Sequence, residues 1–449
     1  MLRIGNAQGF WGDSVDAPAT LLSQQPDLDY LTLDYLAEVS LSIMAAQRAK
    51  DPSLGYARDF VDVVKSLAPL WQAGSTCKLI ANAGGLNPRA CAMACADALR
   101  EAGCTGKRIG IVSGDDVLPI LRARAGESQF TNLDTGESLA TVSDRLVTAN
   151  AYVGGAPVVD ALQQGADIVI TGRVADPCLI AGPAVHHYGW SWDDHDRIAS
   201  ALVAGHLIEC GTQVTGGIST NWLDVPNAGN IGFPVIELHD DASFVVTKPN
   251  GTGGWVNERT VKEQLVYEIG DPGDYITPDA RVSLLSLKLE DLGNDRVRVR
   301  GVKGNPPTDS YKVSATYRDG YWAQGMLTVF GRDAEKKARR SGEIIIERLR
   351  NAGVVLEAHN IECLGAGACA PGILPEPALL ECVLRIAVRD SRREAVERFS
   401  KELAPLVTSG PQGITGYAAG RPRVSPVFGY WPCLIDKREV TCTSEVIAV

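Results

Sequence analysis

The chain has 449 residues and a formal net charge of −11, and it lacks the basic stripe that binds phosphates along a nucleic acid, which excludes a nucleic-acid-binding protein. Hydrophobic residues make up 45% of the chain and charged residues 22%, so the composition predicts a globular protein and excludes disorder. The length predicts more than one domain. No signal peptide or apolar stretch of about 20 residues is present, so we expect a cytoplasmic protein that does not bind membranes.

The first 229 residues alternate apolar strands with helices. Helices are predicted to begin near Pro18, Leu36 and Arg89, and we expect strands over residues 2–4, 30–35, 78–83, 108–112 and 166–170. Continuous apolar strands separated by helices are typical of a parallel sheet that is covered on both faces. The fold class is therefore α/β, and residues 1–229 form the predicted N-terminal α/β domain.

The remaining chain has a different pattern. Residues 230–359 are predicted to be β-rich and to end in a long helix over 333–351, with strands over 233–238, 243–247, 282–289 and 297–302. Residues 360–449 form a small C-terminal α/β portion. There we expect a strand over 381–388, a helix over 392–406 and a late strand over 435–440.

Polar side chains follow the N-terminal strands. Ligands bind beyond the carboxyl ends of parallel strands, so the chemistry is expected at that edge of the sheet. The first strand runs into a glycine-rich loop with Asp13 and Ser14, and two further strand ends carry Asn82 with Asn87 and Asp115 with Asp116. Capping and turn formation would also explain several of these residues. We predict the main pocket near Asp13 and Arg173.

Arg173 and Asp176 lie three residues apart just after an apolar strand. The arginine fork could hold a carboxylate or a CoA phosphate, while Asp176 orients it or acts as a base. The alternative is a structural ion pair that caps the next helix. On the first interpretation, Arg173→Ala should weaken ligand binding about ten- to hundredfold and leave the fold intact.

Cys210 is the one cysteine of eleven whose surroundings suggest chemistry. His206 lies one helical turn earlier, and a neighbouring imidazolium would favour the thiolate. Because of this spacing and the glycine-rich continuation at Gly216-Gly217, we predict that Cys210 reacts faster than the other cysteines; the alternative is a buried cysteine with a chance spacing to His206. Glu209 and Gln213 flank the thiol. The remaining cysteines lack zinc-site spacing and are expected to be buried apolar residues in a reducing compartment.

The segment Lys248–Gly254 is rich in glycine and could bind an anion through Lys248 and backbone N–H groups. It lacks the residue order of a nucleotide-binding P-loop, and no dinucleotide-binding glycine motif opens a helix elsewhere, so ATP and NAD are rejected. We expect no cofactor. Asp115 and Asp116 could nevertheless bind a divalent cation together with other carboxylates.

Several segments together resemble the acyclic terpene utilisation (AtuA-like) family over essentially the whole chain. They are Gly9–Ser14, Thr171–Asp176, Gly205–Gly211, Gln213–Gly217, Lys248–Gly254, Gly270–Tyr275 and Ala404–Thr415. The resemblance implies the catabolism of branched acyl-CoA compounds, in the company of biotin-dependent acyl-CoA carboxylases and enoyl-CoA hydratases. It supplies no residue-level mechanism.

These observations predict a homo-oligomeric enzyme that acts on a branched acyl-CoA or a related small carboxylate, by hydration or dehydration or by carbon–carbon cleavage. The alternative is a non-catalytic subunit or ligand-binding scaffold for a partner acyl-CoA enzyme. The predicted catalytic residues are Asp13, Asp176, Glu209 and Cys210. The predicted substrate-binding residues are Ser14, Asn82, Asn87, Arg173, Gln213, Lys248 and Thr252.

Overall fold

The computed structural model describes residues 1–36, 38–372, 379–417 and 420–449. The chain forms two compact units: unit 1 contains Met1–Thr316 and Tyr430–Val449, and unit 2 contains Tyr317–Gly429. This division differs from the three consecutive segments expected from the sequence. The reason is that strands β14 (Ser310–Phe330) and β18 (Ser425–Asp436) both cross the boundary, so the C-terminal residues return to unit 1.

Unit 1 is built on a mixed sheet with the strand order β11-β12-β8-β7-β1-β2-β3-β6-β4-β19. The central strands pair in parallel, as the sequence predicted. They are β1 (Leu2–Asn6), β2 (Tyr30–Leu33), β3 (Lys78–Ala81), β6 (Ile168–Thr171) and β4 (Arg108–Ser113). The flanking strands pair antiparallel: β7 (Val235–Leu238), β8 (Phe244–Thr247), β11 (Lys288–Asp291), β12 (Val297–Arg300) and β19 (Thr443–Ala448).

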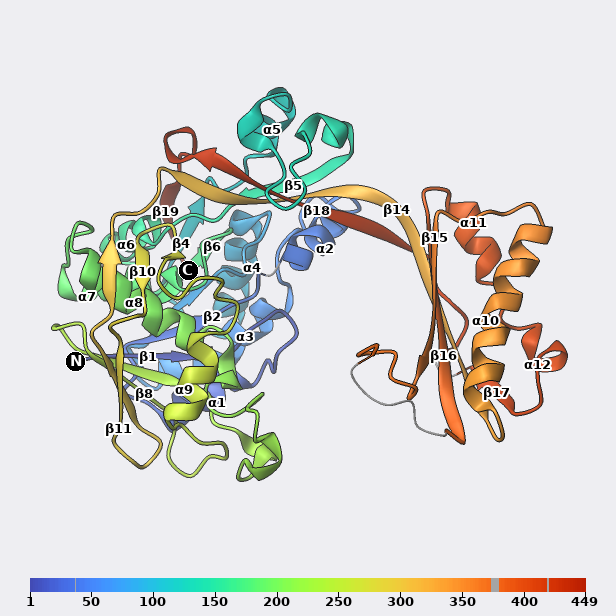
Figure 1. Cartoon of the computed structure of the whole chain (residues 1–449). Helices are drawn as coiled ribbons and strands as arrows, with labels where there is room; N and C mark the ends of the chain where they lie inside the picture. Colours follow the sequence, from blue (N-terminus) through green and yellow to red (C-terminus); the bar gives the residue numbers. More distant parts are fainter. Residues whose placement is uncertain (37, 373–378, 418–419) are drawn as a thin grey trace. The chain divides into compact units, whose positions relative to one another are not determined.

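Two groups of helices cover this sheet (Figure 1). One group is α1 (Ala17–Gln24), α3 (Asp59–Gln72) and α4 (Pro88–Glu101), and the other is α6 (Ala156–Gln163), α7 (Cys178–Tyr188) and α8 (His195–Ile208). Alternate strand residues such as Leu79 and Ile168 share a core with the first group. Because neighbouring strand residues point to opposite faces, Ile80 and Val169 face the second group.

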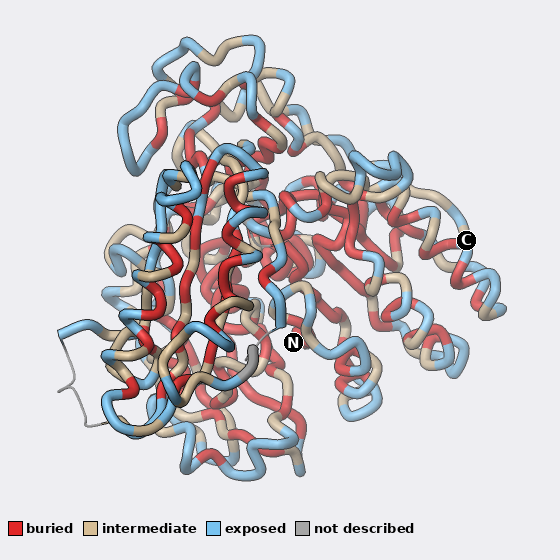
Figure 2. Tube along the Cα trace, turned by 90° about the vertical axis from the view of Figure 1, so that its right-hand side faces the viewer, coloured by how far each residue is buried: buried red, intermediate tan, exposed pale blue. Residues whose placement is uncertain are grey.

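Helix α3 buries one apolar stripe, whereas α7 and α8 are buried on nearly all sides. In α3, Phe60, Val63, Val64 and Leu67 are buried, which is the three- and four-residue spacing of an amphipathic helix. In unit 2 and unit 1 alike, buried residues follow the interior elements and exposed residues gather in the outer turns (Figure 2).

The β-rich part of unit 1 contains a smaller antiparallel sheet of β9 (Tyr275–Ile276), β10 (Arg281–Ser283) and β13 (Lys303–Asn305). The single strand expected over 282–289 is wrong. The chain turns at Leu284–Leu287, where the Leu287 N–H donates to the Leu284 carbonyl, so β10 and β11 belong to different sheets. Strand β5 (Leu146–Ala151), which was not predicted, pairs with β14, and the Thr148 and Thr316 hydroxyls are 2.7 Å apart.

Unit 1 also contains the helices α2 (Glu38–Arg48), α5 (Leu118–Ala123) and α9 (Glu258–Leu265). Helix α9 begins at a capping box, in which the Asn257 side chain accepts from the Thr260 N–H and the Thr260 hydroxyl accepts from the Asn257 N–H.

Unit 2 is an antiparallel sheet packed against helices. Strands β16 (Glu381–Asp390) and β17 (Ile414–Tyr417) pair with β14, and β15 (Ala358–Leu364) pairs with β16 at the edge of the sheet. The helices are α10 (Ala334–Asn351), α11 (Arg393–Phe399) and α12 (Leu406–Ser409). The long helix predicted over 333–351 is confirmed.

Two predictions for the C-terminal segment are wrong. The helix expected over 392–406 stops at Phe399, and α12 begins only after Pro405, whose ring would clash with the backbone of a continuing helix. The strand expected over 435–440 ends at Asp436. There the Asp436 side chain accepts the Arg438 N–H (2.9 Å) and caps a short 3-10 turn.

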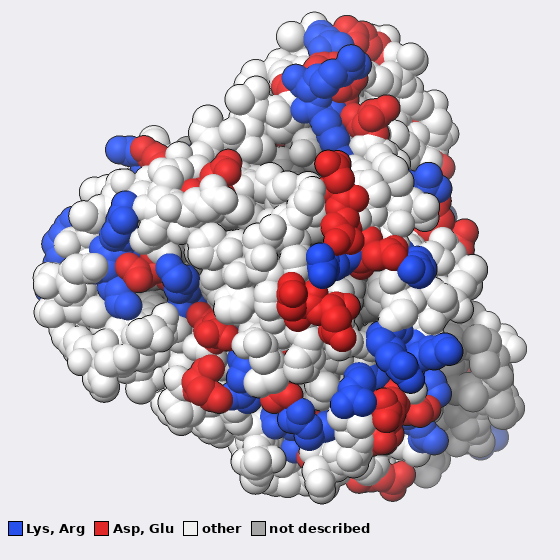
Figure 3. Space-filling model, turned by 90° about the vertical axis from the view of Figure 1, so that its left-hand side faces the viewer, with Lys and Arg blue, Asp and Glu red and all other residues white. Residues whose placement is uncertain are grey.

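On the face shown in Figure 3, Lys and Arg side chains are interspersed with Asp and Glu. None of the helices in the described ranges has the length and apolar character needed to cross a bilayer.

Candidate functional site

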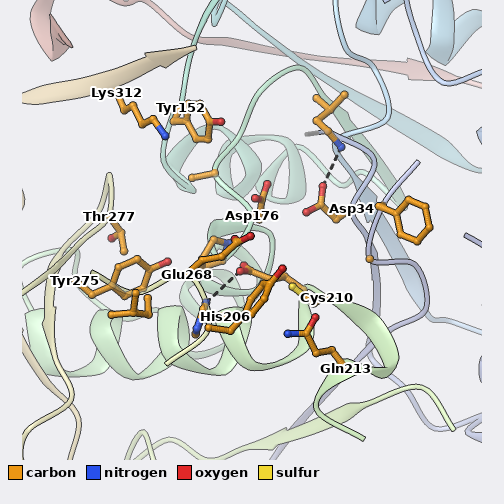
Figure 4. Close-up of a pocket in the computed structure, with 18 of the residues that line it drawn as sticks. Asp34, Tyr152, Asp176, His206, Cys210, Gln213, Glu268, Tyr275, Thr277 and Lys312 are labelled. Carbon is orange, nitrogen blue, oxygen red and sulfur yellow. Dashed lines mark hydrogen bonds and ion pairs between the residues drawn. The ribbon is translucent and has the colours of Figure 1, made fainter. Parts of the chain in front are cut away.

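A cavity of about 770 Å³ lies at the carboxyl ends of the parallel strands of unit 1. Asp13 follows β1, Asp34 follows β2, and Arg173 and Asp176 follow β6. The end of α8, the segment after α9, β9 and the first residues of β14 complete the wall (Figure 4). Asp13 and Arg173 both line this cavity, so the location predicted from the sequence is confirmed.

The end of β1 fixes the end of α8. The Asn6 amide donates to the carbonyl oxygens of Ile208 (2.5 Å) and Glu209 (3.0 Å). A Cβ on Gly9 would lie 2.7 Å from the carbonyl carbon of Cys210, so only glycine allows this close approach of the two segments. The glycine-rich loop therefore positions Glu209 and Cys210 at the cavity.

Glu209 and His206 form a buried pair. The Nδ1 atom of His206 is 3.1 Å from Oε1 of Glu209, and Nε2 donates to the carbonyl oxygen of Gln264 (2.9 Å). Because a carbonyl oxygen only accepts, Nε2 carries a hydrogen, and the hydrogen between Nδ1 and Oε1 can belong to either residue. Figure 4 shows this contact as a dashed line from His206.

The protonation of this pair changes near neutral pH. Burial raises the pKa of Glu209 to about 7, although the hydrogen bond from His206 opposes the shift, and Asp176 and Glu268 add to it. Burial lowers the pKa of His206, but the hydrogen bond and charge of Glu209 more than offset this, so the pKa is raised. Oε2 of Glu209 is buried without a hydrogen-bond partner in the described ranges. Glu209 thus has the properties of a general acid–base.

The guanidinium of Arg173 is held by Asp176 through two contacts, Nη1–Oδ1 at 2.5 Å and Nη2–Oδ2 at 3.3 Å. It also lies 4.1 Å from the centre of the Tyr152 ring, and its side chain is 3% exposed. Burial opposes the charge of Arg173, but Asp176, Tyr152 and Asp34 raise its pKa on balance. The geometry favours the structural ion pair that the sequence left open as the alternative.

Asn82 and Asp115 lie outside the cavity wall and hydrogen-bond to the segments that form it. Asn82 donates to Asp34 (2.7 Å) and accepts the Tyr35 N–H (2.6 Å), while Asp115 accepts the Arg173 N–H (2.8 Å) and the Asn150 amide (2.8 Å). Burial raises the pKa of Asp115. Both side chains hold the strand ends in register and do not line the cavity.

Lys312 brings a positive charge to the cavity from the start of β14. Its ammonium lies 5.2 Å from the Tyr152 ring and 5.9 Å from the Tyr430 ring. In the described part of the chain, no carboxylate pairs with it. This ammonium is therefore better placed than Arg173 to meet an anionic ligand.

The comparison with protein families agrees with the resemblance seen in the sequence. The profile of the acyclic terpene utilisation family protein AtuA matches residues 2–446, which is nearly the whole chain. The chain belongs to the AtuA family. Membership implies a role in acyclic terpene utilisation. Neither the curated proteins nor the solved structures gave a match.

In this AtuA-family chain, the structure corrects the premise of the cysteine prediction. Both ring nitrogens of His206 are bound to Glu209 and Gln264, so the imidazole does not activate the thiol. Burial and the neighbouring Glu209 raise the pKa of Cys210 to about 12. Cys210 lines the cavity as a neutral thiol at neutral pH.

We therefore expect alkylation of native protein at pH 7 to label the exposed Cys369 before Cys210. The rate at Cys210 should rise with pH throughout the alkaline range, because the thiolate is the nucleophile. Peptide mass spectrometry over a time course measures both rates. Faster labelling of Cys210 than of Cys369 at pH 7 would show that the thiol is activated.

The other predicted residues divide into two groups. Gln213 lines the cavity. Ser14 is exposed outside it, and Asn87 caps α4 by accepting the Ala90 N–H (3.3 Å). Lys248 pairs with Asp295 (3.0 Å) and donates to the Thr252 carbonyl (3.1 Å), so this loop also lies outside the cavity. Within the described ranges, no three His, Cys, Asp or Glu side chains are placed to hold a metal together.

Several residues that line the cavity of this chain were not predicted from the sequence, namely Asp34, Tyr152, Glu268, Tyr275 and Lys312. Asp34 directly follows β2, which ends at Leu33. The strand predicted from the sequence extends to residue 35, so Asp34 was counted as part of the strand and not as a polar residue at its carboxyl end. Lys312 and Tyr275 come from the β-rich segment. No local pattern marks them, because only the tertiary fold brings that segment to the strand ends.

Proposed function

We propose that this AtuA-family protein is an enzyme that adds water to, or removes water from, a branched acyl-CoA or a related carboxylate in the cavity of unit 1. One observation carries this proposal: Glu209 is a buried carboxyl in the cavity wall, with the His206 imidazole 3.1 Å from one of its oxygens, and burial raises its pKa to about 7. A group of this kind can both accept and donate a proton at neutral pH. Hydration of an enoyl thioester requires such proton transfers.

The cavity has a size and a lining that suit a branched acyl group. Pockets of about 300–1,000 Å³ are typical of small-molecule sites, and this one encloses about 770 Å³. Its apolar lining comes from Phe10, Leu36, Ala175, Pro177, Ile218, Ile269, Ile276 and Pro278. Phe10, Ile218 and Ile276 are also largely exposed, so the hydrocarbon chain can enter along an apolar rim.

In the proposed dehydration, the Glu209 carboxylate accepts the proton from the carbon next to the thioester. The electron pair of that C–H bond forms the C=C bond as the hydroxyl leaves from the neighbouring carbon, and hydration runs in reverse. His206 binds the Oε1 atom of Glu209 (3.1 Å), and the buried Oε2 atom of Glu209 has no hydrogen-bond partner among the described residues. In carbon–carbon cleavage of a 3-hydroxyacyl-CoA, Glu209 would instead accept the proton of the hydroxyl group. A C=O bond forms as the C–C bond breaks, its electron pair passes to the thioester as an enolate, and the proton returns to that carbon.

Lys312 is the proposed contact for the carboxylate or phosphate of the ligand. Replacing Lys312 with Ala should weaken binding of a 3-methyl-branched acyl-CoA about ten- to hundredfold, the usual effect of losing one charged hydrogen bond. Lys312→Arg should keep most of the affinity. Calorimetric titration measures the binding, and Lys288→Ala, an exposed lysine on β11, is the matched control.

The same experiment tests the proposed function. When wild-type protein is incubated with a 3-methyl-branched enoyl-CoA or 3-hydroxyacyl-CoA, mass spectrometry should show the gain or loss of one water, respectively. Tight binding without any change in the ester would favour the alternative, a ligand-binding scaffold for a partner enzyme. Equal affinities of Lys312→Ala and Lys288→Ala would remove Lys312 from the site.

A further inference from the structure

Asp34 and Asp176 are linked through one amide group. The Nδ2 atom of Asn82 lies 2.7 Å from Oδ1 of Asp34 and 3.4 Å from Oδ1 of Asp176. The two carboxyls come from neighbouring parts of the sheet, after β2 and after β6, with β3 and its Asn82 between them. Figure 4 shows both carboxyls on the same side of the cavity.

The charges around this pair are unequal. Arg173 binds both oxygens of Asp176, which leaves Asp34 with neutral donors: the Asn82 amide and the Leu36 N–H (3.0 Å), both on Oδ1. Oδ2 of Asp34 accepts no hydrogen bond from the described residues. Asp34 also lines the cavity and is 8% exposed. The guanidinium of Arg173 stabilises the ionised form of Asp176, and no cation does this for Asp34 to the same extent. Of the two carboxyls, Asp34 is therefore the one that more readily keeps a proton.

The electrostatics agree with this geometry. Burial and the nearby charge of Asp176 raise the pKa of Asp34, and the opposing effects of Arg173, Asn82 and the Leu36 N–H do not cancel that rise. Two carboxyls that share a site behave in this way, because both cannot ionise at little cost.

We propose that Asp34 is a second catalytic residue of this site, the acid that protonates the departing hydroxyl. The inference rests on the function proposed above. In dehydration, the C–O bond breaks with its electron pair on oxygen, the Asp34 proton joins that oxygen, and water leaves. Glu209 meanwhile accepts the proton from carbon, so one proton is taken up and one is delivered. Asn82 is a positioning residue that holds the acid beside Asp176.

The choice of leaving group separates this role from that of Glu209. A 3-hydroxyacyl-CoA needs an acid to lose its hydroxyl, whereas a 3-chloroacyl-CoA loses chloride without a proton. Asp34→Asn should therefore slow the loss of water from the 3-hydroxyacyl-CoA about 10²–10⁴-fold, the usual contribution of a general acid. The same variant should eliminate chloride from the 3-chloroacyl-CoA at about the wild-type rate. Glu209→Gln should slow both reactions.

Asp176→Asn is the second variant. It frees Arg173 to pair with Asp34, so Asp34 should ionise and the loss of water should again slow while the loss of chloride does not. Thermal unfolding checks that each variant is folded. If Asp34→Asn and Asp176→Asn each slow the loss of water and the loss of chloride equally, or slow neither reaction, Asp34 is not the acid. That result would leave the proposed function of the cavity standing. If wild-type protein eliminates neither group, the proposed function fails and this inference falls with it.

Discussion

Replacing Glu209 with Gln is expected to slow turnover of a branched 3-hydroxyacyl-CoA about 10²–10⁴-fold, the usual contribution of a positioned acid or base. Glutamine keeps the size of the side chain and can still hydrogen-bond to Nδ1 of His206, but it cannot accept a proton from carbon. Steady-state rates with saturating ester measure the effect. Glu101→Gln, at the exposed end of α4, is the matched control and should leave the rate unchanged.

The pH dependence of the wild-type rate has a predicted sign. Glu209 must be ionised to accept the proton, so dehydration should increase as the pH rises through about 7. The stability of the fold should change in the opposite direction. The folded chain keeps the Glu209 proton up to about pH 7, whereas the unfolded chain loses it near the ordinary value of 4.5, so stability falls over that interval. Glu209→Gln should remove this part of the fall, and an unchanged pH dependence of stability would contradict the raised pKa.

Replacing Arg173 with Ala is expected to lower the free energy of unfolding by about 3–5 kcal/mol, because it removes a buried cation and leaves the partly buried carboxylate of Asp176 unpaired. Asp176 loses both of its contacts with the guanidinium, and Tyr152 loses the cation beside its ring. The sequence alone predicted an intact fold and a weaker ligand contact for this change. The buried geometry instead predicts a loss of stability, which denaturant unfolding measures.

The chain offers a matched pair for this test. Arg100 and Asp97 have the same three-residue spacing on α4, but both side chains are exposed, at 45% and 66%. Arg100→Ala should therefore change the stability by about 0.5 kcal/mol or less. Adding Asp176→Ala to Arg173→Ala should restore part of the loss, since it removes the unpaired charge. Equal effects of Arg173→Ala and Arg100→Ala would show that the buried pair contributes no more than a surface pair.

The position of the site could be predicted from the sequence, whereas its contacts could not. Asp13, Arg173 and Asp176 follow apolar strands, and parallel pairing brings such strand ends to one edge. The pairing of side chains depends on rotamers and on neighbours distant in sequence. His206 was expected to contact Cys210, but Glu209 and Gln264 bind both of its ring nitrogens.

The same limit applies to the fold. The parallel core follows from apolar strands and helix spacing, which are local features. Strand β14 was not predicted. It runs from unit 1 into unit 2, and its partner strands β5, β16 and β17 are far apart in the sequence, so its pairing cannot be inferred from local residue patterns. Lys312 belongs to the first residues of this strand, so the cation of the cavity was missed together with it.

The most direct test of the account is hydrogen exchange at the carbon next to the thioester, measured in D₂O with a saturated, branched acyl-CoA that has no leaving group. This reaction isolates the proton transfer assigned to Glu209. Mass spectrometry should show deuterium entering the ester with wild-type protein and with Glu101→Gln, but not with Glu209→Gln. Deuterium incorporation by Glu209→Gln at the wild-type rate would contradict the assignment of Glu209 as the base of this site.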